Sequence, residues 1–205
     1  MSSIRAQRTT SPKRSFWVVV SVSVAAVLWP LTARAVIQVE QPLREMIFGK
    51  TEFVFVAKVS KLDPKRPAML LTPSEQLKGK SPWEKMAVSL KGEEKDLPKL
   101  LKRLADDLPL VVFVTKPSED KYHAMAYTNG TWFDMLGYVD GEAVRWAFVQ
   151  CQPNFRRTFR GTTDELTEVV KLAVARKKAP PPIDKKASPG LGPEIGEQAK
   201  AVGKK

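Results

Sequence analysis

Three side chains with acid–base or ionic character, His123, Asp134 and Arg145, are expected on one face of a β-sheet. Side chains alternate between the two faces of a strand, and the register predicted below places Asp134 diagonal to both His123 and Arg145. Two interpretations of this polar cluster stay open. It is either a set of surface ion pairs or a binding or catalytic site, the latter implying a secreted hydrolase or transferase.

The counts of cysteine and histidine exclude several kinds of chemistry. The chain has one Cys and one His, so it has no internal disulfide, no cysteine-rich zinc site and no multi-histidine metal site. Cys151 and His123 are predicted at opposite ends of the sheet, about 20 Å apart at 3.3 Å per residue, which excludes a Cys–His dyad. The sequence therefore predicts no catalytic set, no metal and no cofactor. Cys151 is interpreted as a small buried hydrophobe, with pairing between chains or a role as a nucleophile as the alternatives.

A second candidate for binding is the arginine-rich segment that contains Arg156, Arg157 and Arg160. It precedes a helix predicted to begin at Thr162, and the free amides of a helix start favour anions. Acidic residues in the first turn of that helix oppose such binding. If the folded part binds an anionic ligand, this junction is the expected place; the alternative is that the arginines are simply solvated.

The elements that position these residues are most clearly specified between residues 121 and 151. Asn129-Gly130 and Asp140-Gly141 favour two-residue β-turns, and they separate strands predicted at 122–128, 131–139 and 142–151. The result is a three-stranded antiparallel meander. One of its faces is expected to join the core and carries Tyr122, Ala124, Ala126, Phe133, Met135, Val144, Trp146 and Phe148.

Further strands and two helices are predicted outside the meander. Leucines at helical spacing indicate a helix over 97–104, and Thr162 with Glu165 forms the capping-box pattern of a second, C-terminal helix. The predicted fold class is α+β, mainly antiparallel β, as an OB-like barrel or strongly curved sheet with one internal and one C-terminal helix. The other strands are predicted at 53–59, 68–72, 85–90 and 110–115.

Three segments in the first half resemble a known architecture: the strand FVFVAKV, then Leu77-Lys78-Gly79, then the strand LPLVVFV. Together they resemble, over residues 47–116, the secreted OB-type barrels of the netrin and tissue-inhibitor-of-metalloproteinase kind. The resemblance implies a barrel-like architecture. No functional residue is carried over from that family.

The N-terminus has the pattern of a secretory signal peptide over residues 1–35. A basic region precedes the apolar run 16–29, and Ala33 and Ala35 supply small residues for cleavage before Val36. The sequence predicts export to the periplasm, cell envelope or outside, by the secretory or the twin-arginine route, with no stable transmembrane anchor after cleavage. The alternative is a protein anchored by an uncleaved N-terminal helix.

Positive charge is concentrated at the two ends of the chain. Residues 1–35 hold five basic and no acidic residues, and residues 176–205 hold eight basic and three acidic ones, which leaves 21 basic and 19 acidic residues between them. This distribution argues against a nucleic-acid partner. Residues 36–176 are predicted to form one globular domain, and residues 177–205 a disordered, basic, Pro- and Gly-rich tail that could contact an anionic surface.

These observations lead to one expectation of function and one alternative. The export pattern, combined with the absence of a catalytic set, predicts an exported, non-catalytic binding or structural module for an unknown protein or envelope partner. The alternative is the secreted hydrolase or transferase centred on His123, Asp134 and Arg145.

Overall fold

The computed structural model describes residues 40–92 and 94–197. The predicted signal peptide and the last residues of the predicted tail therefore lie outside the described part of the chain. The elements occur in the order α1 Leu43–Phe48, β1 Thr51–Asp63, β2 Ala68–Lys78, β3 Met86–Ser89, α2 Leu97–Leu101, β4 Pro109–Ser118, β5 Lys121–Thr128, β6 Thr131–Asp140, β7 Ala143–Cys151, the 3-10 helix η1 Pro153–Arg157, and α3 Thr163–Val174.

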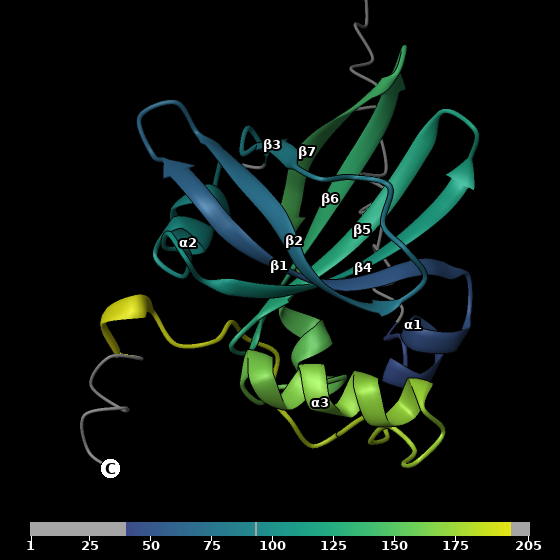
Figure 1. Cartoon of the computed structure of the whole chain (residues 1–205). Coiled ribbons are helices and arrows are strands. Elements are labelled where there is room, and N and C mark those ends of the chain that lie inside the picture. The colour runs from purple at the N-terminus through teal and green to yellow at the C-terminus, as the bar shows by residue number, and fades with distance from the viewer. Residues whose placement is uncertain (1–39, 93, 198–205) are drawn as a thin grey trace, which may run out of the picture. The chain divides into compact units, whose positions relative to one another are not determined.

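The seven strands form a closed barrel in the order β1-β2-β3-β7-β6-β5-β4, with β4 returning to β1 (Figure 1). Neighbouring strands are antiparallel except β3 and β7, which are parallel. Closure gives every strand two neighbours. No strand therefore has one edge unpaired along its whole length. The predicted α+β class with an OB-like barrel is confirmed.

The predicted meander is present, with one correction to its second turn. Asn129 and Gly130 have φ values of 41° and 85°, as a two-residue turn with two left-handed positions requires. At the second turn Asp140 belongs to β6 and pairs with Ala143, and Gly141 has a φ of 62°. The turn therefore uses residues 141 and 142, which moves β7 two residues along β6. A shift of two preserves the faces, because side chains alternate with period two.

The barrel interior is filled by apolar side chains, including all eight residues that the alternation assigned to the core. Trp83, from the loop between β2 and β3, lies among three other aromatic rings at one end of this core. Its ring is nearly perpendicular to those of Phe53, Tyr122 and Trp146, at centroid distances of 5.7, 5.0 and 5.1 Å. Edge-to-face contacts of this kind are favourable for aromatic rings. The interior is thus a packed core.

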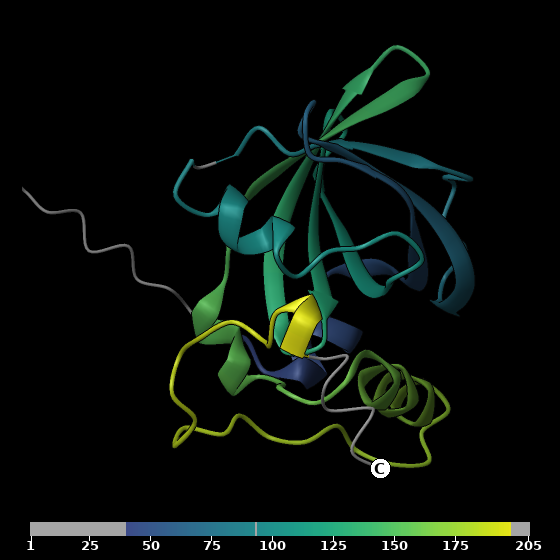
Figure 2. The same cartoon turned by 90° about the vertical axis from the view of Figure 1, so that its left-hand side faces the viewer.

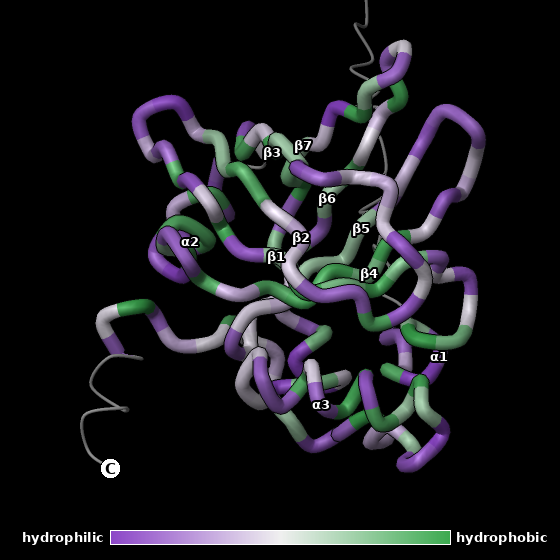
Figure 3. Tube along the Cα trace, viewed as in Figure 1, coloured by the Kyte–Doolittle hydropathy of each residue, from purple (hydrophilic) through white to green (hydrophobic). Residues whose placement is uncertain are grey.

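A second core lies between the outer face of the barrel and the helices α1, η1 and α3, which cover it from below in Figure 1. Tyr127 and Trp132, on the face predicted to be mixed, are both fully buried here. Figure 3 shows the corresponding pattern, with hydrophobic residues along the strands and hydrophilic ones at the hairpin tips. The helices thus cover part of the mixed face and leave the rest, which includes His123, accessible.

The C-terminal helix begins as the sequence predicted. The Thr162 hydroxyl accepts a hydrogen bond from the Glu165 amide at 3.2 Å, and the Glu165 carboxylate accepts one from the Thr162 amide at 2.8 Å. This reciprocal capping box satisfies two amides that the helix itself leaves unpaired. The predicted helix over 97–104 is shorter, since α2 ends at Leu101, although Leu104 is still buried.

The segment after α3 differs from the predicted disordered tail. Residues 177–197, here called the C-terminal strap, run back beneath the helices and up to the barrel (Figure 2). Ala187 is 4% exposed, and Leu191 packs against the barrel core. The prediction of disorder is wrong for this segment because its few apolar residues and its backbone groups find partners on the barrel, which composition alone does not reveal.

Candidate functional site

His123 and Asp134 form the polar pair that the register predicted. They lie on β5 and β6, where Asp134 is paired with Met125 and lies diagonal to His123. His123 Nε2 is 3.7 Å from Asp134 Oδ1, and the two side chains are 39% and 12% exposed. Asp134 Oδ2 accepts a hydrogen bond from Gln152 Nε2, while Oδ1 has no hydrogen-bond partner among the described residues. A nearly buried carboxylate, held by Gln152, thus lies next to the histidine ring without a hydrogen bond to it.

His123 forms part of the wall of a cleft of about 730 Å³ between α1 and the strands β4 and β5. This α1 cleft has an apolar floor, in which Phe113 and Met125 are 2% and 7% exposed. Its rim is polar and holds both signs of charge. The lining residues are Gln41, Glu45, Met46, Gly49, Lys50, Thr51, Phe113, Thr115, Lys116, Pro117, His123 and Met125.

The helix that forms one wall of the α1 cleft is held in place by Lys78. Its ammonium donates to the carbonyl oxygens of Ile47 and Thr51 at 2.7 and 2.6 Å. A cation is favourable at the C-terminal end of a helix, where carbonyl groups are left unpaired. Burial lowers the pKa of the Lys78 ammonium. Gly49 completes the turn after α1, because a Cβ at this position would lie 2.5 Å from the Glu45 carbonyl oxygen.

Arg145 does not join the pair, which corrects the predicted three-residue cluster. Because the second turn uses residues 141 and 142, Arg145 lies opposite Tyr138, four residues along β6 from Asp134. That separation is about 13 Å at 3.3 Å per residue. Arg145 instead forms an ion pair with Asp140, and its side chain is 80% exposed.

The three arginines of the predicted anion site are all engaged by the chain itself. Arg156 donates to the Leu191 carbonyl at 3.1 Å, and Arg157 donates to the Ala187 carbonyl at 3.0 Å and pairs with Glu40. Arg160 forms an ion pair with Asp184, with 3.1 Å between Arg160 Nη2 and Asp184 Oδ2. The helix start beside them is occupied as well, since Asn129 Oδ1 accepts from the Thr163 amide at 3.0 Å. These contacts attach the C-terminal strap to the domain.

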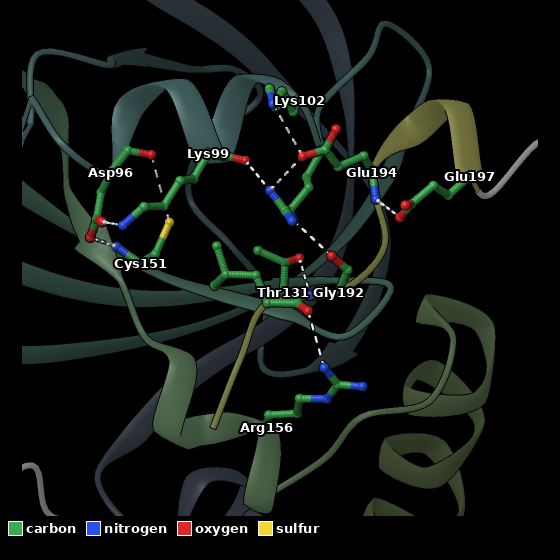
Figure 4. Close-up of polar contacts among 11 residues, drawn as sticks. Asp96, Lys99, Lys102, Thr131, Cys151, Arg156, Gly192, Glu194 and Glu197 are labelled. Carbon is green, nitrogen blue, oxygen red and sulfur yellow. Dashed lines mark hydrogen bonds and ion pairs between the residues drawn. The ribbon is translucent and has the colours of Figure 1, made fainter. Parts of the chain in front are cut away.

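Cys151 is buried close to α2, next to Asp96 and Lys99 (Figure 4), and it lines one cavity with Leu191 of the strap. Its amide donates to Asp96 Oδ2 at 3.0 Å, and Asp96 Oδ1 lies 2.9 Å from the Lys99 ammonium. Burial raises the pKa of the Cys151 thiol to about 12, and the Asp96 carboxylate adds to this effect. The interpretation of Cys151 as a small buried hydrophobe is confirmed. It faces the barrel core, because a bulge in β7 between Phe148 and Cys151, opposite Phe133 and Met135, reverses the alternation there.

Sequence reasoning missed two residues that shape the site. Gln152 follows the last predicted strand, and its contact with Asp134 spans strand ends that no local pattern connects. Lys78 was noted only within the Leu77-Lys78-Gly79 segment, although it fastens α1, a six-residue helix too short for its periodicity to be recognised. No local pattern distinguishes Lys78, because it ends a strand whose second half already carries polar residues such as Glu75 and Gln76.

Within residues 40–92 and 94–197, no group of three or more His, Cys, Asp or Glu side chains is arranged to hold a metal ion. In the same part of the chain, no helix is both long enough and apolar enough to cross a membrane. Comparison of the chain with protein-family models, with curated proteins and with solved structures finds no match in any of the three.

Proposed function

We propose that the protein is an exported, non-catalytic binding module that holds a small polar ligand in the α1 cleft. The observation that carries this proposal is the position of His123 in the cleft wall, with its Nε2 facing a nearly buried Asp134 that is itself held by Gln152. The hydrogen bond from Gln152 keeps the Asp134 carboxylate in place beside the histidine before a ligand arrives, which lowers the entropy cost of binding.

The dimensions and chemistry of the α1 cleft favour a small organic ligand with a carboxylate. Its volume of about 730 Å³ lies within the usual range for such sites, about 300–1,000 Å³. The apolar floor accommodates a carbon skeleton, while Lys50 and Lys116 supply cations at the rim. The Lys116 ammonium already forms an ion pair with Glu119, with 2.6 Å between Nζ and Oε2. Lys50 and His123 are therefore the groups expected to contact an anionic substituent of the ligand.

The hydroxyl groups that line the cleft support a binding role more than a catalytic one. The Thr51 hydroxyl donates to the Met46 carbonyl, and the Thr115 hydroxyl donates to the His123 carbonyl at 3.3 Å. A nucleophilic hydroxyl needs a base within hydrogen-bond reach, and both of these protons point to the backbone instead. The thiol of Cys151 is buried outside the lining of the α1 cleft.

Titration with simple carboxylates tests the proposal. The probes are acetate, citrate and glucuronate, and the readout is the set of amide and imidazole shifts in the NMR spectrum. Binding should move the resonances of His123 and Lys50, and His123→Ala should weaken it at least tenfold while Arg145→Ala leaves it unchanged. Shifts restricted to surfaces away from α1, or equal binding by the two variants, would contradict the proposal.

The second candidate function is a hydrolase or transferase, and the His123–Asp134 pair is the observation that favours it. A histidine supported by a carboxylate can act as a general base toward water or a substrate hydroxyl. Turnover of ester, phosphoester or glycoside substrates that is lost in both His123→Ala and Asp134→Asn, with the melting temperature kept, would establish this alternative over the binding module.

Export is proposed on the basis of residues 1–35, with an unknown protein or envelope component as partner. Mass spectrometry of the secreted protein should give Val36 as its first residue. Recovery of the intact chain from Met1 to Lys205 in a membrane pellet would instead support the N-terminal anchor.

A further inference from the structure

A second cleft, of about 460 Å³, lies between α1 and the end of α3. Figure 1 shows α1 next to the C-terminal end of α3, where the chain turns into the C-terminal strap. Arg44 and Phe48 lie one turn apart on α1 and both line this cleft. We call the surface that lines it the Phe48 patch. Its residues are Arg44, Phe48, Ala173, Arg176, Lys178, Ala179 and Pro180.

The apolar centre of the patch is the exposed ring of Phe48. Three other apolar residues of α1, Leu43, Met46 and Ile47, are buried against the barrel and α3, whereas Phe48 is 47% exposed. Exposing so much of an aromatic ring to water costs free energy, which is recovered when the ring enters an apolar phase. The patch therefore presents one large apolar side chain for insertion.

The charge around Phe48 has one sign. Arg44, Arg176 and Lys178 are exposed and form no ion pair with another described residue, and the neighbouring Lys177 is exposed as well. No acidic residue of the described chain lines the patch. Because positive charge attracts anionic partners and disfavours cationic ones, the complementary partner is anionic.

Helix geometry alone does not account for these cations. Arg44 lies in the first turn of α1, where the helix dipole disfavours positive charge. Arg176 follows α3 with a φ of 56°, a conformation that glycine adopts at a lower cost. Local stability thus favours other residues at both positions, which points to a role outside the fold.

The side chains of the patch suit a surface of many equivalent anions above an apolar layer. The described residues that line it carry only cationic or apolar side chains, without a carboxylate, hydroxyl or amide group to fix the orientation of a ligand. Recognition therefore depends on charge and on burial of the Phe48 ring. A phospholipid membrane with anionic headgroups offers both.

We propose that the Phe48 patch docks the protein on an anionic phospholipid membrane. The Phe48 ring enters the boundary between headgroups and acyl chains, where aromatic side chains are favoured, and Arg44, Arg176 and Lys178 contact the lipid phosphates. The patch and the α1 cleft have no lining residue in common. The proposal is therefore independent of the ligand proposed for the α1 cleft.

Sedimentation with vesicles tests the proposal on the protein in its exported form. One set of vesicles is phosphatidylcholine alone, and the other is an equimolar mixture with phosphatidylglycerol. Binding to the mixed vesicles should be at least tenfold tighter and should weaken as salt is added, because salt screens exposed charges. Phe48→Ser should weaken this binding at least fivefold. Phe48→Trp should retain it and add a fluorescence emission that brominated lipid quenches.

The matched protein variants carry equal changes of charge. Arg44→Glu with Lys178→Glu should weaken binding to the mixed vesicles at least tenfold. Lys58→Glu with Lys121→Glu, at positions outside the patch, should leave it within twofold. All four side chains are exposed, so both variants should keep the melting temperature of the wild type.

A third variant separates the patch from general attraction by the C-terminal strap. Lys185→Glu with Lys186→Glu, at exposed positions of the strap, should also leave binding within twofold. Equal weakening in the patch variant and either control, equal binding to the neutral vesicles, or no binding at all would overturn the proposal. Tighter binding of polyglutamate or of free glycerol phosphate, lost in the patch variant, would overturn it in favour of an acidic protein or a small anion.

Discussion

Gly192 and Asn129 lie so close together that a Cβ on Gly192 would be 1.9 Å from the carbonyl oxygen of Asn129. Gly192 also donates its amide to Thr131 Oγ1 at 3.0 Å, and its carbonyl accepts from Arg103 Nε at 2.7 Å (Figure 4). The C-terminal strap is therefore fixed to the barrel at a position where only a residue without a side chain fits.

Replacing Gly192 with Ala should detach this part of the strap and expose Cys151, because Leu191 and Cys151 line the same cavity of about 290 Å³. The rate of thiol labelling by a disulfide reagent at pH 8 should rise at least tenfold. Gly196→Ala is the control, since a Cβ there meets nothing within 4 Å. Equal labelling rates in the two variants would show that the strap does not protect the thiol.

The raised pKa of Cys151 predicts a loss of stability at alkaline pH. The thiol ionises near 9.0 in the unfolded chain and near 12 in the folded protein, so above pH 9 the unfolded state binds fewer protons and is favoured. The stabilisation is complete well below pH 9 and should fall by about 1.4 kcal/mol between pH 8 and 10. Urea unfolding at both pH values measures this. Cys151→Ala should show a smaller decrease, and identical decreases in the two proteins would contradict the prediction.

The capping box at the start of α3 should contribute measurably to stability. Thr162→Ala removes the hydroxyl that accepts from the Glu165 amide, and such changes cost about 1 kcal/mol. Thr162→Ser keeps the oxygen and should stay within about 0.5 kcal/mol of the wild type. Thermal unfolding followed by circular dichroism distinguishes the two, and an unaltered midpoint in Thr162→Ala would mean that tertiary packing alone sets the helix start.

The parts of the fold that the sequence predicted are those with local physical causes. Asn129-Gly130 fixed one turn, strict alternation assigned the core face of the meander, and Thr162 with Glu165 marked a helix start. The His123–Asp134 pair followed from the same turn, because the register of β5 and β6 depends on it alone.

The features that the sequence did not reveal depend on contacts between distant segments or on a shift of a few residues. The second turn lies one residue later than predicted, and this small displacement separated Arg145 from Asp134. The partners of Arg157 were not predicted, because Glu40 and Ala187 lie in segments that no periodicity connects to it. A local pattern can predict that an arginine is present at a surface but not which part of the chain neutralises it.

Only two residue pairs, Val88 with Trp146 and Ser89 with Ala147, join β3 to β7, and they determine the order in which the barrel can assemble. Every other pair of neighbouring strands in the second half of the barrel is joined by a tight hairpin, whereas Val88 and Trp146 are more than fifty residues apart in the sequence. Closing so long a loop costs entropy that only two pairs repay, so this contact forms after the hairpins and is the first to break. Amide hydrogens at this junction should therefore exchange with solvent before those of the β5–β6 hairpin, which makes the β3–β7 contact the point where the folded barrel opens.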